Sequence, residues 1–375
     1  MIKNFFKNCV KTGHRLIVTL HLNDFIFRIL LPYKHKIIEQ TPEDAETILK
    51  KISPKPSGKA ITLNKIIDNT MYDLQIIVPA FNAEKFIIQC MDSILTQVTQ
   101  YTFKIVLIDD GSTDSTGRIA DEYAKTNCNK VKVIHQNNQG FSGARNTGLS
   151  TILGKYIMFV DSDDKLLPGA IENLMNAAIK NDADIVEGGF HYLIGKILLP
   201  CCKHKTNTCI SKGLYGYPWG KVYRNNLFTC IKFPESFWFE DTIMPFLVFP
   251  QAKKTHVINA VVYAYRKNNN VAISSTAPFN IKCIDTYWIT ELVLEERDYV
   301  SLPYDNECFS KLINQILLNY SRTRLMRQEI KWCIFTLSSQ MVKKYFSNYL
   351  PCKNPLIELL LCNDFGGYCL YCETH

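Results

Sequence analysis

Three aspartates follow directly after an apolar run near the middle of the chain. Residues 156–160 read Tyr-Ile-Met-Phe-Val, and Asp161, Asp163 and Asp164 come next. Hard divalent cations such as Mg²⁺ and Mn²⁺ prefer carboxylate oxygens, and Mg²⁺ is often held by one or two carboxylates together with a substrate's phosphates. In open α/β sheets ligands bind beyond the carboxyl ends of the strands, where Asp161 and Asp163 are expected. The pattern predicts a metal site, although solvated turn residues give the same short pattern.

A second apolar run, at 103–108, ends in another acidic and glycine-containing segment. It continues as Asp-Asp-Gly-Ser-Thr-Asp-Ser over residues 109–115. Asp110 could accept a hydrogen bond from a base N–H, an arrangement that discriminates strongly when the site is buried. The alternative is that the segment only forms a turn and caps the next helix.

The segment Asn138–Gly148 carries a candidate anion-binding group. Arg145 offers a planar fork to phosphate or to a pyrimidine edge. Ser142 is expected to cap a helix whose exposed N–H groups and dipole suit an anion. An ordinary surface arginine is the competing interpretation.

The elements around these residues alternate between strand and helix. Short apolar runs and amphipathic stretches of this kind predict a parallel, doubly wound sheet, and therefore an α/β fold. Beyond residue 275 the pattern becomes helical. The predicted strands are 74–79, 103–108, 130–135 and 156–160. The predicted helices are 82–95, which Asn82 opens, 115–125, 142–153, 168–180, 312–319 and 330–345.

The N-terminal part differs in composition from the rest. Residues 1–70 read as helical pieces that end in a Pro, Gly and Lys-rich stretch at 53–59, which is typical of a linker. The predicted organisation is a basic N-terminal extension over 1–70, a sheet domain over 71–275 and a helical region over 276–375.

Charge is unevenly spread along the 375 residues, whose net charge is +8. Seven Lys and Arg residues but a single acid, Asp24, occupy the first 36 positions. Each basic residue near an anionic lipid surface contributes about 1 kcal/mol to the binding free energy. The charge pattern of residues 1–36 therefore predicts peripheral membrane contact, and a solvated basic face is the alternative. No run reaches the ~18 apolar residues of a membrane span. The 14 cysteines form no regular framework, so a cytoplasmic location is expected.

The four segments together resemble the family 2 glycosyltransferases of the GT-A fold. The resemblance runs through VPAFN, DDGSTD, NQGFSGARN and DSDD in this order and covers roughly residues 72–270. The first strand lacks the glycine-rich turns of dinucleotide folds and P-loops, which agrees with this family. The resemblance implies a nucleotide-diphosphate sugar as donor, commonly a uridine one. It assigns Pro79 and Asp110 to the base, Arg145 to the nucleotide or diphosphate, and Asp161 and Asp163 to ribose and a Mg²⁺ or Mn²⁺ ion.

A further pair of acids, Glu240 and Asp241, matches the family's ED motif. An acceptor hydroxyl is a poor nucleophile until a positioned carboxylate takes its proton, which contributes typically ~10²–10⁴-fold. The resemblance therefore implies that Asp241 is the base of an inverting transfer, with Glu240 as the second candidate. Acids at the start of a helix, which the helix dipole favours, are the alternative.

Two fainter matches lie nearby. Lys221, in Pro218–Tyr223, is expected to face phosphate or acceptor, and residues 263–266, followed by Ser274 and Ser275, are expected to form an active-site lid. Aromatic core packing is the alternative for both segments.

The expected acceptor is a hydroxyl of a glycan or of a lipid-linked glycan in surface polysaccharide biosynthesis, with no nucleic-acid partner. A catalytically silent nucleotide-sugar-binding scaffold is the alternative function. A sugar-phosphate nucleotidyltransferase would need a glycine-rich basic loop after the first strand, and residues 81–84 read Phe-Asn-Ala-Glu instead.

Overall fold

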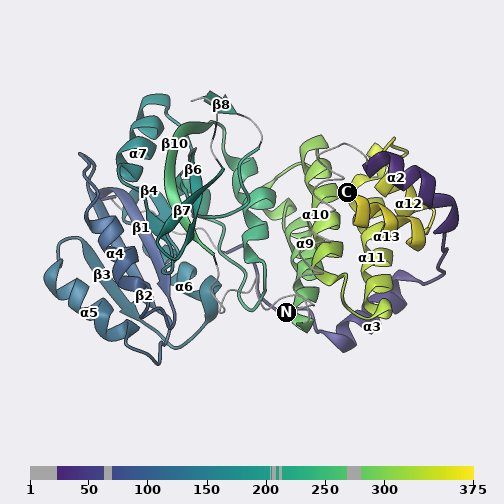
Figure 1. The fold of residues 1–375 in the computed structure, drawn as a ribbon, viewed down its shortest axis with the longest axis horizontal. Coiled ribbons are helices and arrows are strands. Elements are labelled where there is room, and N and C mark those ends of the chain that lie inside the picture. Colours follow the sequence, from purple (N-terminus) through teal and green to yellow (C-terminus); the bar gives the residue numbers. More distant parts are fainter. Residues whose placement is uncertain (1–22, 63–69, 203, 205–207, 211–212, 268–279) are drawn as a thin grey trace. The chain divides into compact units, whose positions relative to one another are not determined.

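The computed structural model shows an α/β sheet with helices packed on it, followed by a set of helices (Figure 1). The structure describes residues 23–62, 70–202, 204, 208–210, 213–267 and 280–375. These residues group into two compact units, which we describe separately. The sheet unit contains the described residues of 56–267 and residues 292–302; the helical unit contains 23–55, 280–291 and 303–375.

The described strands of the sheet unit form one mixed sheet in the order β3-β2-β1-β4-β9-β6-β10-β5. The first four strands in this order are parallel, and β9 runs antiparallel to both β4 and β6. The predicted α/β fold with a mostly parallel sheet is confirmed. The strand bounds are β1 (Tyr72–Ala80), β2 (Phe103–Asp109), β3 (Val131–His135), β4 (Gly154–Phe159), β5 (Lys165–Leu166), β6 (Ile185–Ile194), β7 (Ile197–Cys202), β8 (Thr208–Ile210), β9 (Lys221–Arg224) and β10 (Thr255–Arg266).

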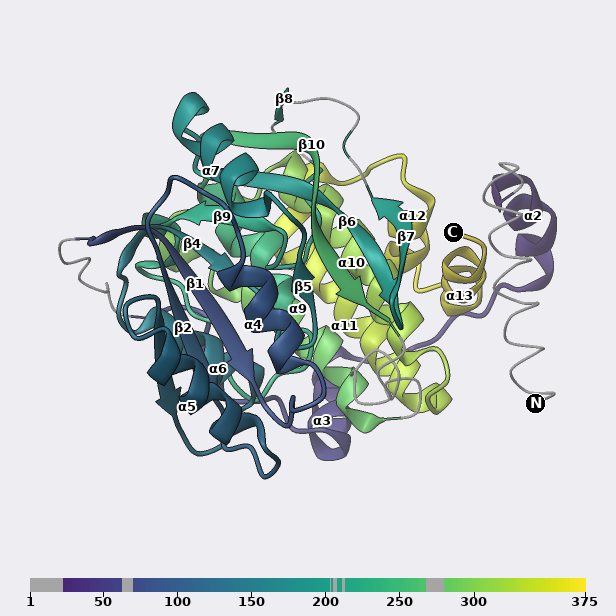
Figure 2. The same ribbon diagram turned by 60° about the vertical axis from the view of Figure 1, so that its left-hand side comes forward.

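Helices cover both faces of the parallel half of the sheet (Figure 2). Leu74, Ile76 and Val78 of β1 point to one face, into a core shared with α4 and α7. Ile77 points to the other face, where α6 lies so close that a Cβ on Gly148 would stand 2.5 Å from the Ile77 Cγ2. A strand buried on both sides explains why the sequence shows continuous apolar runs here. The helix bounds are α4 (Ile87–Leu95), α5 (Thr116–Thr126), α6 (Gly140–Leu149) and α7 (Ala170–Asn181).

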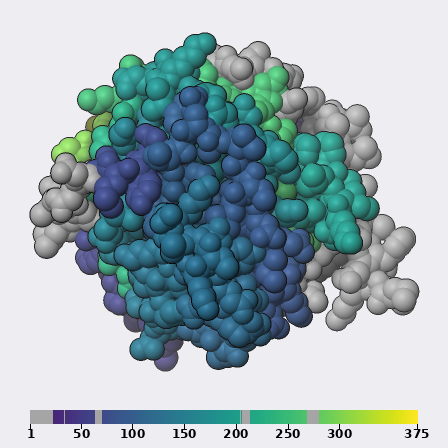
Figure 3. Space-filling view, turned by 90° about the vertical axis from the view of Figure 1, so that its left-hand side faces the viewer, coloured from purple at the N-terminus to yellow at the C-terminus, as the bar shows by residue number. Residues whose placement is uncertain are grey.

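The side of the sheet unit that carries α5 and β3 faces the viewer in Figure 3, where blue and teal residues of the first four strands and their helices form most of the surface. Two predicted helix starts on this half are wrong. α4 begins at Ile87 because Asn82 adopts a left-handed φ of 47° and its side-chain oxygen accepts from the Thr113 N–H at 2.8 Å. α6 begins at Gly140, so Ser142 lies inside the helix and does not cap it.

The predicted linker at 53–59 leads directly into residues that belong to the sheet unit. Ala60 accepts from the Lys232 N–H at 2.8 Å and donates its own N–H to the Glu296 carboxylate at 2.7 Å. Thr62 donates to the Cys230 carbonyl at 2.9 Å. The sheet unit therefore begins near residue 56, before the predicted start at Met71, because these backbone groups find their hydrogen-bond partners there.

The helical unit confirms the predicted helical C-terminal pattern and extends the two predicted helices at both ends. Side chains cap several of its helices: Thr41 accepts from the Asp44 N–H at 3.1 Å and Asp305 from the Cys308 N–H at 2.8 Å. The N-terminal helix bounds are α2 (Asn23–Leu30) and α3 (Pro42–Ile52); the others are α9 (Asp285–Glu295), whose last turn counts with the sheet unit, α10 (Asn306–Thr323), α11 (Gln328–Phe346), α12 (Pro355–Leu361) and α13 (Phe365–Thr374).

Within the part of the chain that the structure describes, no helix combines the length and apolar character needed to cross a membrane.

Candidate active site

An arginine links two of the predicted acidic motifs at the carboxyl edge of the sheet. Arg145, on α6, places its Nη2 2.8 Å from Oδ1 of Asp161, which follows β4. Its Nη1 lies 2.5 Å from Oε1 of Glu240, in the short helix η3 (Glu240–Thr242). The Arg145 side chain is only 6% exposed, and its guanidinium also lies 5.2 Å from the ring centroid of Phe233. The surface-arginine interpretation is therefore wrong, because a cation buried this deeply needs its anionic partners.

Charge and burial oppose each other in this cluster. Burial lowers the pKa of Arg145, but the charges of Asp161 and Glu240 raise it above its ordinary value, so the guanidinium stays protonated. Burial raises the pKa of Glu240 to about 7; the Arg145 charge works against this shift and the charge of Asp241 adds to it. Glu240 is therefore a carboxyl whose ionisation is linked to its arginine partner.

Asp241 stands next to Glu240 but in a different environment. It is half-buried, whereas Glu240 is buried. Phe239, the residue before the pair, has a left-handed φ of 64°, which is unfavourable for a side chain of this kind and is found mostly where the surrounding structure holds it. Because Glu240 is engaged with Arg145, Asp241 is the better candidate for a group that meets a substrate.

Strand β10 contacts the acidic turn, residues 161–164, which follows β4. The Asp161 N–H donates to the Tyr263 hydroxyl at 3.1 Å, and the Arg266 N–H donates to the Asp164 carboxylate at 2.6 Å. The Arg266 Nε donates to the Asp163 carbonyl at 2.6 Å. Residues 263–266 are therefore a fixed strand and not the predicted lid, while Ser274 and Ser275 lie outside the described residues. The sequence singled out this segment but did not predict that it supports the acidic turn, because no local pattern relates a strand end to a turn about 100 residues earlier.

The acidic turn concentrates negative charge. Asp164 is fully buried, and burial together with the charges of Asp163 and Asp161 raises its pKa well above the ordinary value. Among the described residues, no group of three or more His, Cys, Asp or Glu is arranged to hold a metal by itself. Asp161 and Asp163 instead offer two carboxylates beside an excess of negative charge, which fits a divalent cation that takes its other ligands from a diphosphate.

The two residues predicted to contact the base lie on neighbouring strands. Pro79 is on β1, and Asp110 follows β2 and donates its N–H to the Ala80 carbonyl at 2.8 Å. The buried Asp110 carboxylate accepts from Gln136 at 2.7 Å and from the Gln139 N–H at 2.9 Å. Asp110 thus fixes the loop that leads into α6, the helix that carries Arg145.

Lys221 does not lie where the sequence predicts. Its side chain is 1% exposed, and its Nζ lies 2.8 Å from the Glu187 carboxylate, which is equally buried. The same Nζ donates to the Tyr217 carbonyl at 2.8 Å, and Glu187 also accepts from the Tyr215 N–H at 2.9 Å. The expectation that Lys221 faces phosphate or acceptor is corrected to a buried ion pair, because the strand that starts at Lys221 points it into the sheet unit.

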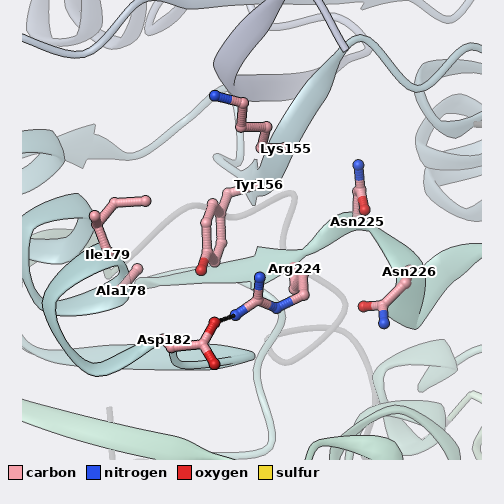
Figure 4. A pocket seen from close by; sticks show the side chains of 8 residues that line it. All are labelled: Lys155, Tyr156, Ala178, Ile179, Asp182, Arg224, Asn225 and Asn226. Carbon is pink, nitrogen blue, oxygen red and sulfur yellow. Dashed lines mark hydrogen bonds and ion pairs between the residues drawn. The ribbon is translucent and has the colours of Figure 1, made fainter. Parts of the chain in front are cut away.

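A hollow of about 460 Å³ lies at the other end of β4 (Figure 4). One of its lining residues, Arg224, is paired with Asp182 at 2.7 Å and with Asp184 at 2.8 Å, and its guanidinium lies 5.4 Å from the Tyr156 ring centroid. It is distant in the sheet from the acidic turn and contains none of the predicted site residues. The lining residues are Lys155, Tyr156, Ala178, Ile179, Asp182, Arg224, Asn225 and Asn226.

Comparison with known proteins finds similar glycosyltransferases. Residues 75–198 match the family model described as glycosyl transferase family 2. The chain is 34% identical over 218 residues to the uncharacterized glycosyltransferase EpsJ of Bacillus subtilis, which covers 52% of this chain and 62% of EpsJ. It is 32% identical over 214 residues to glycosyltransferase GlyA of Streptococcus pneumoniae, covering 52% of this chain and 30% of GlyA. The chain thus spans less than two thirds of either relative.

Solved structures agree in fold. Residues 1–349 of S. aureus TarS, in complex with UDP-GlcNAc, superpose with a TM-score of 0.63 at 20% identity, over 79% of this chain and 89% of that one. The sheet, its helices and the acidic strand ends define a GT-A fold. Residues 75–198 are thus similar to the family 2 glycosyltransferases, and the fold is shared with TarS.

Replacing the buried lysine tests whether its role is structural. Lys221→Met removes the ammonium group from the buried Glu187, which keeps only its contact with the His204 Nε2 at 2.8 Å among basic side chains of the described residues. We expect the free energy of unfolding to fall by about 3–5 kcal/mol, measured by urea denaturation. Glu122→Gln, which breaks the exposed Arg118–Glu122 pair, is the matched control and should change stability by less than about 1 kcal/mol. Equal effects of the two variants would contradict the buried ion pair.

Glu240 should give the stability of the protein a pH dependence of known sign. Its folded-state pKa is raised to about 7 from an ordinary 4.5, so the folded protein retains a proton that the unfolded chain releases. This contribution to stability is fully present below about pH 4.5 and is lost as pH rises through about 7. We expect the wild type to lose stability relative to Glu240→Gln across this window, measured by urea denaturation at a series of pH values. Parallel curves for the two proteins would show that the carboxyl is not buried as described.

Proposed function

We propose that this protein transfers a sugar from a nucleotide-diphosphate sugar, with UDP as the nucleotide, to a hydroxyl of a glycan or lipid-linked glycan acceptor, with inversion at the anomeric carbon. The observation that carries the proposal is Arg145, which joins Asp161 of the acidic turn to Glu240 of the ED pair. This contact brings the candidate donor-binding and base-bearing segments to one edge of the sheet. That TarS has been crystallised with UDP and with UDP-GlcNAc supports a uridine donor.

The reaction needs a base, and Asp241 is the residue proposed for it. The acceptor hydroxyl gives its proton to the Asp241 carboxylate while its oxygen forms a bond to the anomeric carbon. The bond from that carbon to the diphosphate oxygen breaks on the opposite face, and the electron pair leaves with the nucleotide diphosphate. Glu240 does not compete for this role because it is buried against Arg145, and it acts by holding the arginine in position.

The leaving diphosphate must be stabilised as its negative charge grows. Asp161 and Asp163 would hold a Mg²⁺ or Mn²⁺ ion, which supplies Lewis-acid stabilisation of that charge when bound. Arg145 keeps Asp161 in place and contributes a fixed positive charge at the same edge. Arg266 and Tyr263 hold the backbone of the acidic turn, so the carboxylates do not have to be ordered when the substrate arrives.

Two substitutions test the base and the metal ligand. With Mn²⁺ and a panel of UDP-sugars, release of UDP dependent on an added acceptor extract should fall about 10²–10⁴-fold in Asp241→Asn, because no carboxylate takes the hydroxyl proton. It should fall at least about 10²-fold in Asp163→Ala, as when one group that stabilises the transition state is removed. Binding of UDP in the presence of Mn²⁺, measured by calorimetry, should survive in Asp241→Asn and weaken in Asp163→Ala.

Asp298→Asn is the matched control, since Asp298 is an exposed aspartate of the same unit, and it should leave both measurements unchanged. Turnover that survives Asp163→Ala and EDTA would exclude the metal role. Tight UDP binding without UDP release from any donor would favour the alternative of a silent scaffold.

We further propose that the N-terminal segment binds an anionic membrane surface, at the inner face of the cell membrane. Most of residues 1–36 lies outside the described residues, but α2 is described. On it Phe25 and Ile29, four positions apart, are 63% and 51% exposed, and Arg28 beside them is also exposed. An apolar stripe next to basic residues is typical of a helix that lies in the lipid interface.

Sedimentation with phosphatidylglycerol vesicles tests this contact. Deleting residues 2–22 removes four basic side chains and should weaken binding at least about tenfold, at about 1 kcal/mol for each charge. The deletion spares Phe27, whose ring packs 5.3 Å from that of Tyr371, so the helical unit keeps this contact. Phe25→Ser with Ile29→Ser should also weaken binding, whereas Leu318→Ser, at an exposed leucine of α10, should not. Unchanged binding in the first two variants would refute the proposal.

A further inference from the structure

A stack of aromatic rings leads from the acidic turn to the surface. Tyr263 packs parallel to Trp219 with ring centroids 4.6 Å apart, and Trp219 packs parallel to Tyr217 at 4.6 Å. The interplanar angles are 8° and 5°. Tyr265 adds a nearly parallel ring 5.2 Å from Trp219 and 6.5 Å from Tyr217. Tyr263 and Trp219 are buried, whereas Tyr217 is 43% exposed.

The inner end of this stack belongs to the candidate active site. The Tyr263 hydroxyl accepts from the Asp161 N–H, as described above. The pKa of Tyr265 is raised to about 12, mainly by burial. Smaller contributions come from the charges of Asp164, Tyr217, Asp161 and Asp163, in this order. Tyr265 therefore lies within electrostatic reach both of the acidic turn and of the exposed ring, so the stack connects the reacting edge to the surface.

The sheet order separates this stack from the nucleotide side. Pro79 and Asp110 lie at the ends of β1 and β2, on one side of β4. Tyr263 and Tyr265 lie on β10, and Tyr217 lies in the loop before β9, on the other side of β4 (Figure 2). The acidic turn at the end of β4 stands between the two. In the proposed complex the base of the donor lies at β1 and β2 and its diphosphate at β4. The part of the sheet edge from β9 to β10 then remains for the acceptor.

The exposed ring is held in place by its surroundings. The Tyr217 carbonyl accepts from the buried Lys221 Nζ, and the Phe190 ring stands at 87° to the Tyr217 ring with centroids 6.3 Å apart. Trp219 covers one face of Tyr217. A side chain that is already ordered loses little conformational entropy when a ligand packs on it.

We propose that Tyr217 is the platform on which a sugar ring of the acceptor packs, so that the acceptor is a glycan with a pyranose ring near the reacting hydroxyl and not an open polyol chain. The C–H groups on one face of a pyranose carry small positive charges, and an aromatic face is negative, so the two pack flat against each other. This inference rests on the proposed function, because it assigns the acceptor of that same site.

An array of bacterial surface oligosaccharides, probed with the full-length protein in the presence of UDP and Mn²⁺, tests the platform. Poly(glycerol phosphate), which has no ring, is included on the array. We expect the wild type and Tyr217→Phe to bind a shared set of ring-bearing glycans, and Tyr217→Ala to bind them about tenfold more weakly. With the best of these glycans as acceptor, KM for the acceptor should rise about tenfold in Tyr217→Ala, with little change in kcat.

Tyr217→Leu, which keeps an apolar side chain without a ring, replaces Tyr217→Ala if that variant does not fold. The same loss of glycan binding is expected. Tyr299→Ala, at a tyrosine of the same unit that is 75% exposed, is the control and should bind as the wild type does. The platform is refuted if Tyr217→Ala binds glycans as tightly as the wild type, if KM rises for the donor and not the acceptor, or if the wild type binds only the polyol or nothing on the array. UDP release that depends on the added acceptor extract is measured in parallel, since its absence in the wild type would contradict the proposed function while leaving glycan binding as a separate result.

Discussion

A buried positive charge between two carboxylates is the constraint on which the rest of the sheet unit depends. Arg145 is almost fully buried, and it is stable there only because Asp161 and Glu240 approach it from two other elements. Removing both partners would leave the guanidinium charge without compensation in a place that water reaches poorly. This one cation therefore fixes the relative positions of α6, the end of β4 and the short helix η3, which are the three elements that carry the candidate chemistry.

A second arginine, Arg266, also stabilises the acidic turn, through both its backbone and its side chain. Arg266 donates to the Asp163 carbonyl through its side chain and to the Asp164 carboxylate through its backbone, and its guanidinium also lies 4.7 Å from the Phe86 ring centroid. These contacts orient the turn without using the Asp161 carboxylate. The turn keeps a concentration of carboxylates that would suit a divalent cation, and the contacts from Arg266 already order its backbone.

The half of the sheet beyond β4 is stabilised by a buried ion pair and by stacked aromatic rings. Glu187 and Lys221 form a buried ion pair there, and the rings of Tyr263, Trp219 and Tyr217 pack in parallel beside it. The ion pair holds the loop before β9 through the Tyr217 carbonyl. A polar, acid-rich edge thus meets an aromatic one at the acidic turn.

Local sequence patterns predicted the alternation of strands and helices, the α/β fold and the positions of Asp110, Asp161 and Asp163 after strand ends, because apolar periodicity and turn composition are local properties. Which of these groups meet depends on how the chain folds. Arg145 and Glu240 are 95 positions apart, and the arginine became a buried bridge when the chain folded. Lys221 illustrates the same limit, since the sequence predicted a contact with phosphate or acceptor, whereas in the folded protein Lys221 pairs with Glu187, 34 positions earlier in the sequence. Local patterns encode the elements, but long-range packing decides the partner of each charge, because it determines which charges are removed from water together.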